Sequence, residues 1–429
     1  MKVFSLITGI LLLAAGTPSP GAESLDQAWQ AALSADRQLQ SARSLEQAAE
    51  QNLAAARAER RPRVTLSTSA TRLDSAPAFS FGDAFRSPPL FDDDLLLMGG
   101  AQLQLPLFTG GAIASAIASA QSSHAAGKAG VQSARQDLRL AVVQAYVNVL
   151  RARSAVAVAD SNVASLEAQT RDAENQFEFG SVPRNDYLAA AVSLADARQR
   201  QLQAANQLEL AHAAYNRQLQ RDLSSPVDLA ADLPDPLQGV SLDSLDSLIA
   251  TALDHRSELQ ALSARRQALA ARSRAERARL RPQVGLTGGY SRLETQVLDD
   301  DGFWMIGVGV NWSLFDGGRI RSRASALESQ AAAVGHSEAD LRSRIALQVR
   351  SARLNLDESS ARVVVASKAV EQSEENLRVS RDRYLAGSGT STEVLDAEAL
   401  RARSMNNRDN AHFDEILARF RLARALGVL

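Results

Sequence analysis

The sequence predicts a mainly α-helical protein with a transmembrane β part, built from long antiparallel coiled-coil helices and four strands per chain. Three observations predict this fold class: a long internal duplication, heptad stripes that continue for many turns without proline, and four short segments in which apolar and polar residues alternate. Heptad stripes are typical of helices that wind around a partner, and strict alternation is typical of strands with one apolar face.

The first 22 residues have the form of a secretory signal peptide. A positive charge at Lys2 precedes a short apolar core, and small residues lead to a cleavage site that we place after Ala22. An uncleaved membrane anchor is the alternative, but the apolar core is shorter than the ~20 residues that a membrane-spanning helix needs. The sequence therefore predicts residues 1–22 as the signal peptide and an exported mature protein. No later stretch is long and apolar enough to cross a bilayer as a helix.

The composition argues against several classes of function. The 47 basic and 49 acidic residues nearly balance, so nothing points to nucleic acid. The chain has no cysteine, which excludes disulfides, thiolate metal sites and a lipid-modified amino terminus. The histidines are scattered and form no metal-ligand spacing, so we predict neither a metal nor a cofactor. No arrangement of residues suited to catalysis is present in the sequence, and we predict that the chain is not an enzyme.

A duplication divides the chain into two related units. A Leu-Phe-x-Gly-Gly motif occurs at residues 107–111 and again at 314–318, an offset of 207 residues. An Arg-Pro pair at 61–62 recurs at 281–282, an offset of 220. A period this long indicates a duplicated structural unit rather than a short solenoid repeat. We predict a first repeat at residues 23–223, a proline-containing linker at 224–240 and a second repeat at 241–429.

Each repeat is expected to contain one long helix and two shorter ones. Apolar and small residues recur at alternating spacings of four and three through residues 113–177 and 319–384. No proline interrupts these stretches, so each long helix can run for ~65 residues and ~100 Å before it ends at Gly180 or Gly387. An ordinary amphipathic bundle helix is the alternative, and the great length argues against it. We expect the shorter helices at about residues 25–60, 184–220, 242–281 and 393–426.

Two segments with a period of two lie between the first short helix and the long helix of each repeat. In the second repeat, for example, Trp304, Ile306 and Val308 alternate with small or polar residues. One apolar face and one small or polar face are typical of a transmembrane barrel strand. We predict β-hairpins at residues 62–107 and 282–314. A soluble, half-buried hairpin is the alternative for each strand taken alone.

Four strands are too few to close a barrel. An open sheet edge in lipid leaves backbone amides unpaired, at several kcal/mol each, and the smallest membrane barrels need about eight strands. The sequence therefore predicts an oligomer whose small and polar strand residues line a water-filled opening. The coiled-coil helices would continue this opening as a tube.

The order and register of these motifs resemble the outer membrane factor family, the TolC-like channel tunnels of bacterial efflux pumps and type I secretion systems. The resemblance covers essentially the whole mature chain. It rests on the duplicated Leu-Phe-x-Gly-Gly motif and on Arg383-Tyr384-Leu385-Ala386-Gly387, Glu393-Val394-Leu395-Asp396-Ala397 and Ala425-Leu426-Gly427.

The resemblance implies a homotrimer whose chains share a 12-stranded β-barrel in the outer membrane and an α-barrel in the periplasm. Export through such a channel is passive. The implied partners are a periplasmic adaptor (membrane fusion) protein, an inner-membrane transporter of the RND, ABC or MFS class, and outer membrane lipid.

The resemblance also implies the candidate site residues. A periplasmic gate is expected at Asp186, Tyr384, Glu393 and Asp396. The adaptor is expected to contact the hairpin tips at Gly180, Ser181, Val182, Gly387, Ser388 and Gly389. The strand–helix junctions are expected at Gly110, Gly111, Gly317 and Gly318. Capping of the following helix is the alternative role for Glu393.

One tip position departs from the family pattern. Tips of the family often carry an arginine that ties the closed state, and this chain has Gly389 there. Our hypothesis is that Arg184, on the other tip, replaces that arginine.

A second class of function explains part of the sequence. A trimeric coiled-coil surface adhesin, or a periplasm-spanning scaffold without transport, would account for the heptads and the strands. It would not need two matched units with paired hairpin tips, and it would not conduct ions in a planar bilayer. The sequence does not identify the exported substrate, which can be a drug, a metal ion or a protein, nor does it name the adaptor and pump.

Overall fold

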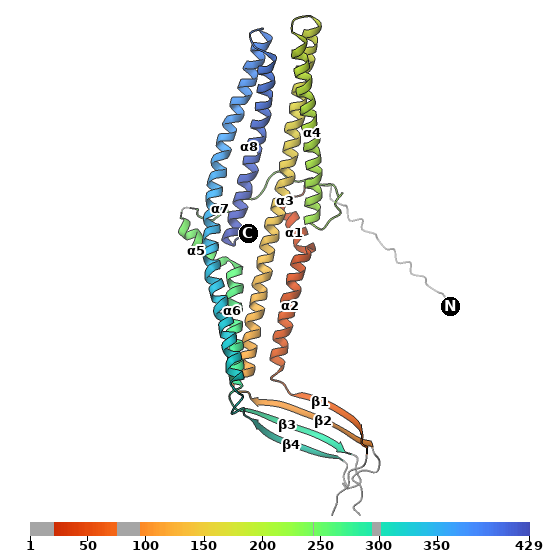
Figure 1. Ribbon diagram of the computed structural model, residues 1–429, viewed down its shortest axis with the longest axis vertical. Helices are drawn as coiled ribbons and strands as arrows, with labels where there is room; N and C mark the ends of the chain where they lie inside the picture. The colour runs from red at the N-terminus through yellow and green to blue at the C-terminus, as the bar shows by residue number, and fades with distance from the viewer. Residues whose placement is uncertain (1–20, 75–94, 243, 294–301) are drawn as a thin grey trace, which may run out of the picture.

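The computed structural model describes residues 21–74, 95–242, 244–293 and 302–429, so all but the last two residues of the predicted signal peptide lie outside the described part. The described residues form long helices above a small sheet (Figure 1). The helices are α1 (Leu25–Ala35), α2 (Arg37–Ala58), α3 (Ala112–Glu178), α4 (Arg184–Gln218), α5 (Leu245–His255), α6 (Ser257–Ala278), α7 (Arg319–Leu385) and α8 (Ser391–Leu426). The strands are β1 (Arg63–Arg72), β2 (Leu95–Phe108), β3 (Gln283–Leu293) and β4 (Gly302–Asn311).

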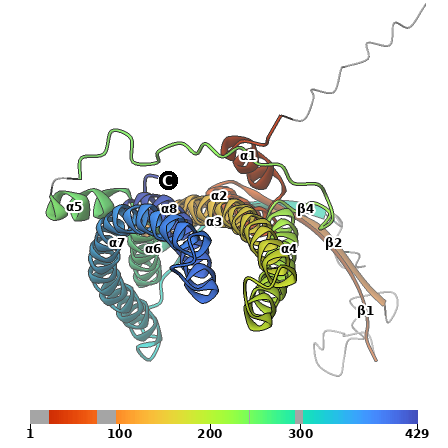
Figure 2. The same cartoon turned by 90° about the horizontal axis from the view of Figure 1, so that it is seen from above.

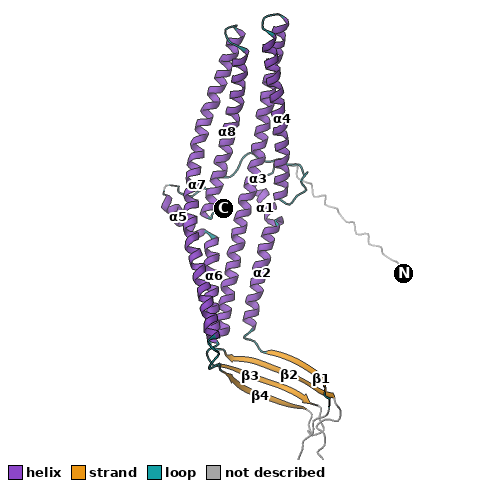
Figure 3. Cartoon of the chain, in the orientation of Figure 1, coloured by secondary structure: helices purple, strands orange, loops and turns teal. Residues whose placement is uncertain are grey.

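The two halves of the chain repeat the same series of elements. The first residues of α1, α2 and β1 return 220 residues later in α5, α6 and β3, and those of α3 and α4 return 207 residues later in α7 and α8. The long helices α3 and α7 each contain 67 residues, which corresponds to ~100 Å. The shorter α2 and α4 pack along α3, and α6 and α8 pack along α7. Every described strand lies at one end of the molecule (Figure 3).

The prediction of one unbroken helix at residues 25–60, and of another at 242–281, was wrong. Each is split, at Asp36 and at Arg256. The Asp36 carboxylate accepts a hydrogen bond from the Leu39 amide (2.7 Å) and so caps a new helix. Arg256 is buried, and its guanidinium donates to the carbonyl oxygen of Ala425 (3.2 Å). The breaks place α1 and α5 on the convex side of the helical arc (Figure 2).

The four described strands form one antiparallel sheet in the order β1-β2-β3-β4. The register places Val64, Leu103, Gly288 and Ile306 in one row across the sheet, on one face. The neighbouring rows on that face are also mainly apolar, and we call it the outer face. The opposite, inner face carries glycine, serine, threonine and glutamine at most positions. The sheet therefore has the two-faced pattern that the alternation predicted.

The largest apolar cluster lies midway along the helices, where the short helices meet end to end. Trp29 of α1 contacts the ring of Phe420 edge-on, with ring centroids 6.2 Å apart. Tyr146 and Tyr215 are fully buried nearby, and the Tyr146 hydroxyl lies 2.7 Å from the carbonyl oxygens of both Glu23 and Ala230, which share its single proton. Burial raises the pKa of Tyr146 to about 12, and the Glu23 carboxylate adds to that rise. This cluster fixes the ends of the short helices against α3.

A buried ionic network ties the carboxyl end of α8 to the start of α6. Arg424 donates to the Glu258 carboxylate (2.5 Å) and to Asp137 of α3 (2.8 Å), and Arg256 donates to Glu258 (3.0 Å). Burial alone would raise the pKa of Glu258. The hydrogen bond and charge of Arg424, a backbone amide and Arg256 outweigh burial and lower the pKa to about 2.

We predict that Glu258→Gln lowers stability at neutral pH and that the difference from the unmodified protein becomes smaller in acid. A depressed folded-state pKa contributes stability that is present above the ordinary carboxyl pKa and is lost as the pH falls toward 2. The contribution at pH 7 is at most about 3 kcal/mol. Melting temperatures between pH 7 and pH 3 check this. Glu375→Gln, in an exposed pair with Arg378, is the control, and equal gaps at both pH values would contradict the prediction.

Candidate functional site

The two helical hairpins, α3–α4 and α7–α8, end in tips at the end of the molecule opposite to the sheet (Figure 1). Gly180 and Gly387 have positive φ angles of 69° and 72°, a conformation that glycine adopts without steric strain. The amide of Ser181 donates to the carbonyl oxygen of Gln176 (2.8 Å), and that of Ser388 to the carbonyl oxygen of Arg383 (2.9 Å). Both long helices therefore end in the same Schellman-type turn. The residues predicted to contact the adaptor occupy these two turns: Gly180, Ser181, Val182, Gly387, Ser388 and Gly389.

Arg383 braces the second tip, and sequence reasoning did not assign it this role. Its guanidinium lies 3.3 Å from the Glu393 carboxylate and donates to the carbonyl oxygen of Ser388 (3.2 Å). A Cβ atom at Gly389 would lie 3.1 Å from the Cβ of Arg383 and 3.1 Å from the amide nitrogen of Tyr384. A side chain at position 389 would therefore crowd the turn.

Tyr384 lies inside the second tip. It is 8% exposed and packs with Leu377, Val394 and Ala397. Its hydroxyl has no hydrogen-bond partner within the described part of the chain. Burial raises the pKa of Tyr384, and the negative charges of Asp186 and Asp172 raise it further. The fold thus brings Tyr384 close to the acidic residues of the first tip.

The three predicted acidic gate residues lie in different surroundings. Glu393 is half-buried and pairs with Arg383, and its amide donates to the side-chain oxygen of Thr390 (3.3 Å), which caps α8. Asp396 is exposed, one helical turn further along α8, and pairs with no described residue of the chain. Asp186 is half-buried in the first turn of α4. Arg184, the arginine of our hypothesis, is exposed and makes no ion pair with the described residues.

A buried ionic cluster connects the two hairpins below the tips, and nothing in the sequence marks it. Glu398 of α8 is only 1% exposed. It pairs with Arg381 of α7 and accepts a hydrogen bond from the hydroxyl of Ser165 on α3 (2.6 Å). Arg381 also donates to Ser165 (2.5 Å). Since the cluster joins residues more than 200 positions apart, only the tertiary structure reveals it.

The four junction glycines lie at the start of the long helices. Gly110, Gly111, Gly317 and Gly318 all have positive φ angles. At Gly110 an added Cβ atom would lie 2.7 Å from the Cβ of Arg281, whose guanidinium donates to the Gly110 carbonyl oxygen (2.9 Å). Asp316 caps the second junction by accepting hydrogen bonds from the amides of Gly318 (3.0 Å) and Ile320 (2.8 Å). The motif is therefore a tight strand-to-helix turn.

No described helix has the length and apolar character that would let it cross a membrane. In the same described ranges, no cluster of three or more histidine and carboxylate side chains is arranged to hold a metal ion.

Comparison with known proteins identifies the family. The model of the outer membrane efflux protein family matches residues 28–217 and 248–428. The outer membrane efflux protein BepC of Brucella suis is 24% identical over 333 residues, which cover 76% of this chain and 71% of BepC. The alkaline protease secretion protein AprF of Pseudomonas aeruginosa is 26% identical over 310 residues, which cover 70% of this chain and 63% of AprF.

The fold also matches a solved structure along nearly its whole length. The outer membrane protein VceC of Vibrio cholerae superposes with a TM-score of 0.79 at 19% identity, covering 94% of this chain and 96% of VceC. The predicted fold class, channel function and outer membrane location are thereby confirmed, and the adhesin or scaffold alternative is not supported. The chain belongs to the outer membrane efflux protein family, a family of channel proteins.

Proposed function

We propose that three copies of this chain form a channel-tunnel, with a shared 12-stranded β-barrel in the outer membrane and an α-barrel in the periplasm. Export through it is passive, and the chain acts as a conduit rather than as an enzyme. One observation carries this proposal: a single chain forms an incomplete arc (Figure 2). Both side edges of the arc expose groups that would pair or pack with another copy.

The first unsatisfied feature is the pair of sheet edges. Among the described strands, β1 and β4 each pair with only one neighbour. The outer face they belong to is strongly exposed in the single chain: Trp304 and Ile306 are each 82% exposed. Within lipid, the unpaired amides of an open edge cost several kcal/mol each. Pairing β1 of one copy with β4 of the next removes both edges.

The second unsatisfied feature lies on the helices at the same flanks. Leu188, Val192 and Leu202 of α4 are exposed on the side turned away from α3. Leu347 and Leu354 of α7 lie seven residues apart, on one face of the helix, and both are exposed. Because α4 and α7 are the two ends of the arc (Figure 2), copies that stand side by side would place the α4 flank of one copy against the α7 flank of the next. Such a head-to-tail contact between unlike flanks closes into a ring.

The tips form the proposed gate and docking surface. We assign Asp186, Tyr384, Glu393 and Asp396 to the gate, since they gather around the two tips. The exposed turns at 180–182 and 387–389 are assigned to a periplasmic adaptor, which connects the channel to an inner-membrane RND, ABC or MFS transporter. The relatives BepC and AprF are named for efflux and for protease secretion respectively, and both kinds of cargo are compatible with a passive tunnel.

The duplicated elements support the proposed division of the chain. We assign residues 1–22 to the signal peptide, 23–223 and 241–429 to the two repeats, and 224–240 to the linker. The linker is attached near the amino terminus of α1, where the Glu23 amide donates to the Asp228 carbonyl oxygen (2.8 Å). The junction glycines at 110–111 and 317–318 are assigned to the turns that connect barrel strands to tunnel helices.

Conductance in planar bilayers tests the proposal. The purified trimer is expected to conduct, with a preference for cations set by three copies of Glu393 and Asp396. Because Glu393 is partly neutralised by Arg383, Asp396→Asn is expected to lower the ratio of cation to anion permeability more than Glu393→Gln, by about twofold or more. Asp254→Asn, at an exposed carboxylate on α5 far from the tips, is the control. A trimer without conductance would overturn the channel proposal.

A further inference from the structure

A belt of arginines lies where the helices meet the sheet. Residues 57–63, 277–281 and 319–323 are at the end of α2, the end of α6 and the start of α7 (Figure 1). These three short ranges contain ten arginines and a single carboxylate, Glu59. All ten arginines are exposed. Although the charges of the whole chain nearly balance, positive charge is concentrated at this level.

Most of this charge is not compensated within the chain. Glu328 pairs with Arg277 at 2.7 Å, and Glu276 lies 3.5 Å from Arg279 and 3.9 Å from Arg323. The other seven arginines of the belt form no ion pair with the described residues. A belt with this excess of unpaired guanidinium groups is suited to binding an anion.

The unpaired arginines are divided between the two flanks of the arc. Four of them, at positions 57, 60, 61 and 63, lie beside the edge strand β1, and Arg319 and Arg321 follow the other edge strand, β4. Since β1 and β4 have their helix ends on the same side of the sheet, pairing β1 of one copy with β4 of the next places the two groups side by side. Neighbouring strands are about 5 Å apart and packed helices about 8–10 Å apart, so the two groups would repel each other. Glu59 can compensate one arginine, and the Asp316 carboxylate already accepts two amide hydrogen bonds.

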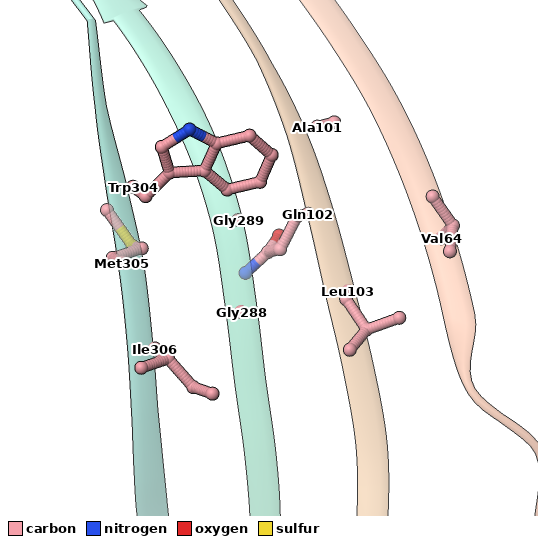
Figure 4. A pocket seen from close by; sticks show the side chains of 9 residues that line it. All are labelled: Val64, Ala101, Gln102, Leu103, Gly288, Gly289, Trp304, Met305 and Ile306. Atoms are coloured by element: carbon pink, nitrogen blue, oxygen red, sulfur yellow. The ribbon is translucent and has the colours of Figure 1, made fainter.

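Apolar side chains lie directly beside this charge. Val64 and Ile306 lie on the outer face of the sheet at its two edges (Figure 4). Between β4 and α7, Leu314 and Phe315 are 78% and 89% exposed, and Trp312 is also exposed. Tryptophan and arginine next to an apolar surface are typical of the level at which acyl chains meet lipid headgroups. The surroundings of the belt therefore favour a lipid phosphate over a free anion.

We propose that an anionic phospholipid binds at each seam between copies, with its phosphate between Arg60 and Arg61 of one copy and the Arg319–Arg321 segment of the next. A guanidinium matches a phosphate with two parallel hydrogen bonds. Consecutive helical residues point about 100° apart, and Ile320 is buried against its own chain, so Arg319 and Arg321 lie on opposite sides of it and one of them is on the outer side of α7. The inference rests on the proposed function, which supplies the seam between copies.

Removing the arginines of one flank at a time tests the site. Binding of phosphatidylglycerol to the purified trimer is measured by native mass spectrometry, and the temperature at which the trimer dissociates is measured in nanodiscs. Phosphatidylglycerol is expected to raise this temperature above its value in phosphatidylcholine alone. Arg60→Gln/Arg61→Gln and Arg319→Gln/Arg321→Gln are each expected to weaken phosphatidylglycerol binding about tenfold. In phosphatidylcholine alone, both variants are expected to be at least as stable as the unmodified trimer, because they relieve the repulsion.

The matched control is Arg171→Gln/Arg403→Gln. Both arginines are exposed and form no ion pair with the described residues. Arg171 follows the start of α3 by 59 residues, ~90 Å along the helix from the sheet. This control removes two charges far from the proposed seam site, so it should bind phosphatidylglycerol as the unmodified trimer does.

Three results would overturn the inference. One is that either belt variant binds phosphatidylglycerol as tightly as the control does. Another is that inorganic phosphate stabilises the unmodified trimer as much as phosphatidylglycerol, which would indicate a site for a free anion. The third is that the belt variants lose stability, or fail to assemble, in phosphatidylcholine alone, which would make the arginines direct contacts between copies. Bilayer conductance is recorded for the unmodified trimer, so a trimer that conducts but has no preference for the anionic lipid refutes this site alone.

Discussion

Replacing Leu202 or Leu354 by aspartate is expected to convert the trimer into monomers. Leu202 is 73% exposed on α4 and Leu354 is 59% exposed on α7 in the single chain. Burying a leucine between neighbouring copies stabilises the assembly by about 2–3 kcal/mol, and an unpaired carboxylate there costs several kcal/mol more. Because the seam occurs three times, the loss is on the order of 10 kcal/mol per trimer.

Size-exclusion chromatography with light scattering in mild detergent measures this effect. Leu202→Met keeps the seam apolar and is expected to remain trimeric. Leu400→Asp is the matched control for an added charge, since Leu400 is 44% exposed on α8, which packs between α7 and α3 and lies away from the flanks. A Leu202→Asp protein that stays as trimeric as Leu400→Asp would show that α4 does not form the seam.

Replacing Arg381 by methionine is expected to open the periplasmic end of the channel. The substitution leaves the Glu398 carboxylate, which is 1% exposed, without its cation. Removing one partner of a fully buried ion pair typically costs about 3–5 kcal/mol. The cost here is smaller, because the Arg381 side chain is 40% exposed, but it still favours separation of the two hairpins. Since Glu398 and Ser165 join α8 to α3, we expect the two hairpins to separate and the single-channel conductance to rise.

A neighbouring arginine supplies the control for this experiment. Arg378, one turn away on α7, pairs only with Glu375 and Asp382 of its own helix among the described residues, and the pairs are exposed. Arg378→Met should therefore leave the conductance unchanged. The double variant Arg381→Met/Glu398→Met removes both charges of the ion pair. It should recover stability, but it should not restore the polar contacts that join the two hairpins. Equal conductance of Arg381→Met and Arg378→Met would reject a role for the cluster in gating.

The same recordings test Arg184. Our sequence-based hypothesis predicts that Arg184→Ala raises the conductance, because the substitution would remove an interaction that holds the tips closed. Within the described part of the chain Arg184 has no acidic partner, so such an effect would require an acidic group from a neighbouring copy. Unchanged conductance would reject that role and leave Arg381 and Arg383 as the arginines that stabilise the tips.

The features predicted well are those that depend on neighbouring residues. The long helices were expected at 113–177 and 319–384 and are observed at Ala112–Glu178 and Arg319–Leu385. Heptad spacing and a terminal glycine are local signals, so they indicate a helix and its end without knowledge of the tertiary contacts. The strand pattern was recognisable for the same reason, because apolar residues alternate with small or polar residues along each strand.

The features that were missed depend on distant residues. The break at Arg256 is stabilised by a hydrogen bond to Ala425, 169 positions away, so the local sequence reads as a continuous helix. The Glu398 cluster needs Ser165 from the other repeat. For Arg383, the sequence placed the residue at the tip, but only the turn geometry brings its guanidinium to Glu393. A helical pattern predicts the face of the helix on which a residue lies. It does not identify the partner of that residue in a distant part of the chain.

The sharing of one barrel by several copies can be measured directly with cysteine pairs, because the chain has no cysteine of its own. One cysteine replaces Thr65 in β1, and the other is moved along β4 from Met305 to Gly309. Within a chain these strands are separated by β2 and β3, ~14 Å, which is too far for a disulfide. Oxidation is predicted to give covalent dimers and trimers for at least one pair. A folded protein in which every pair stays monomeric would contradict a barrel shared between copies.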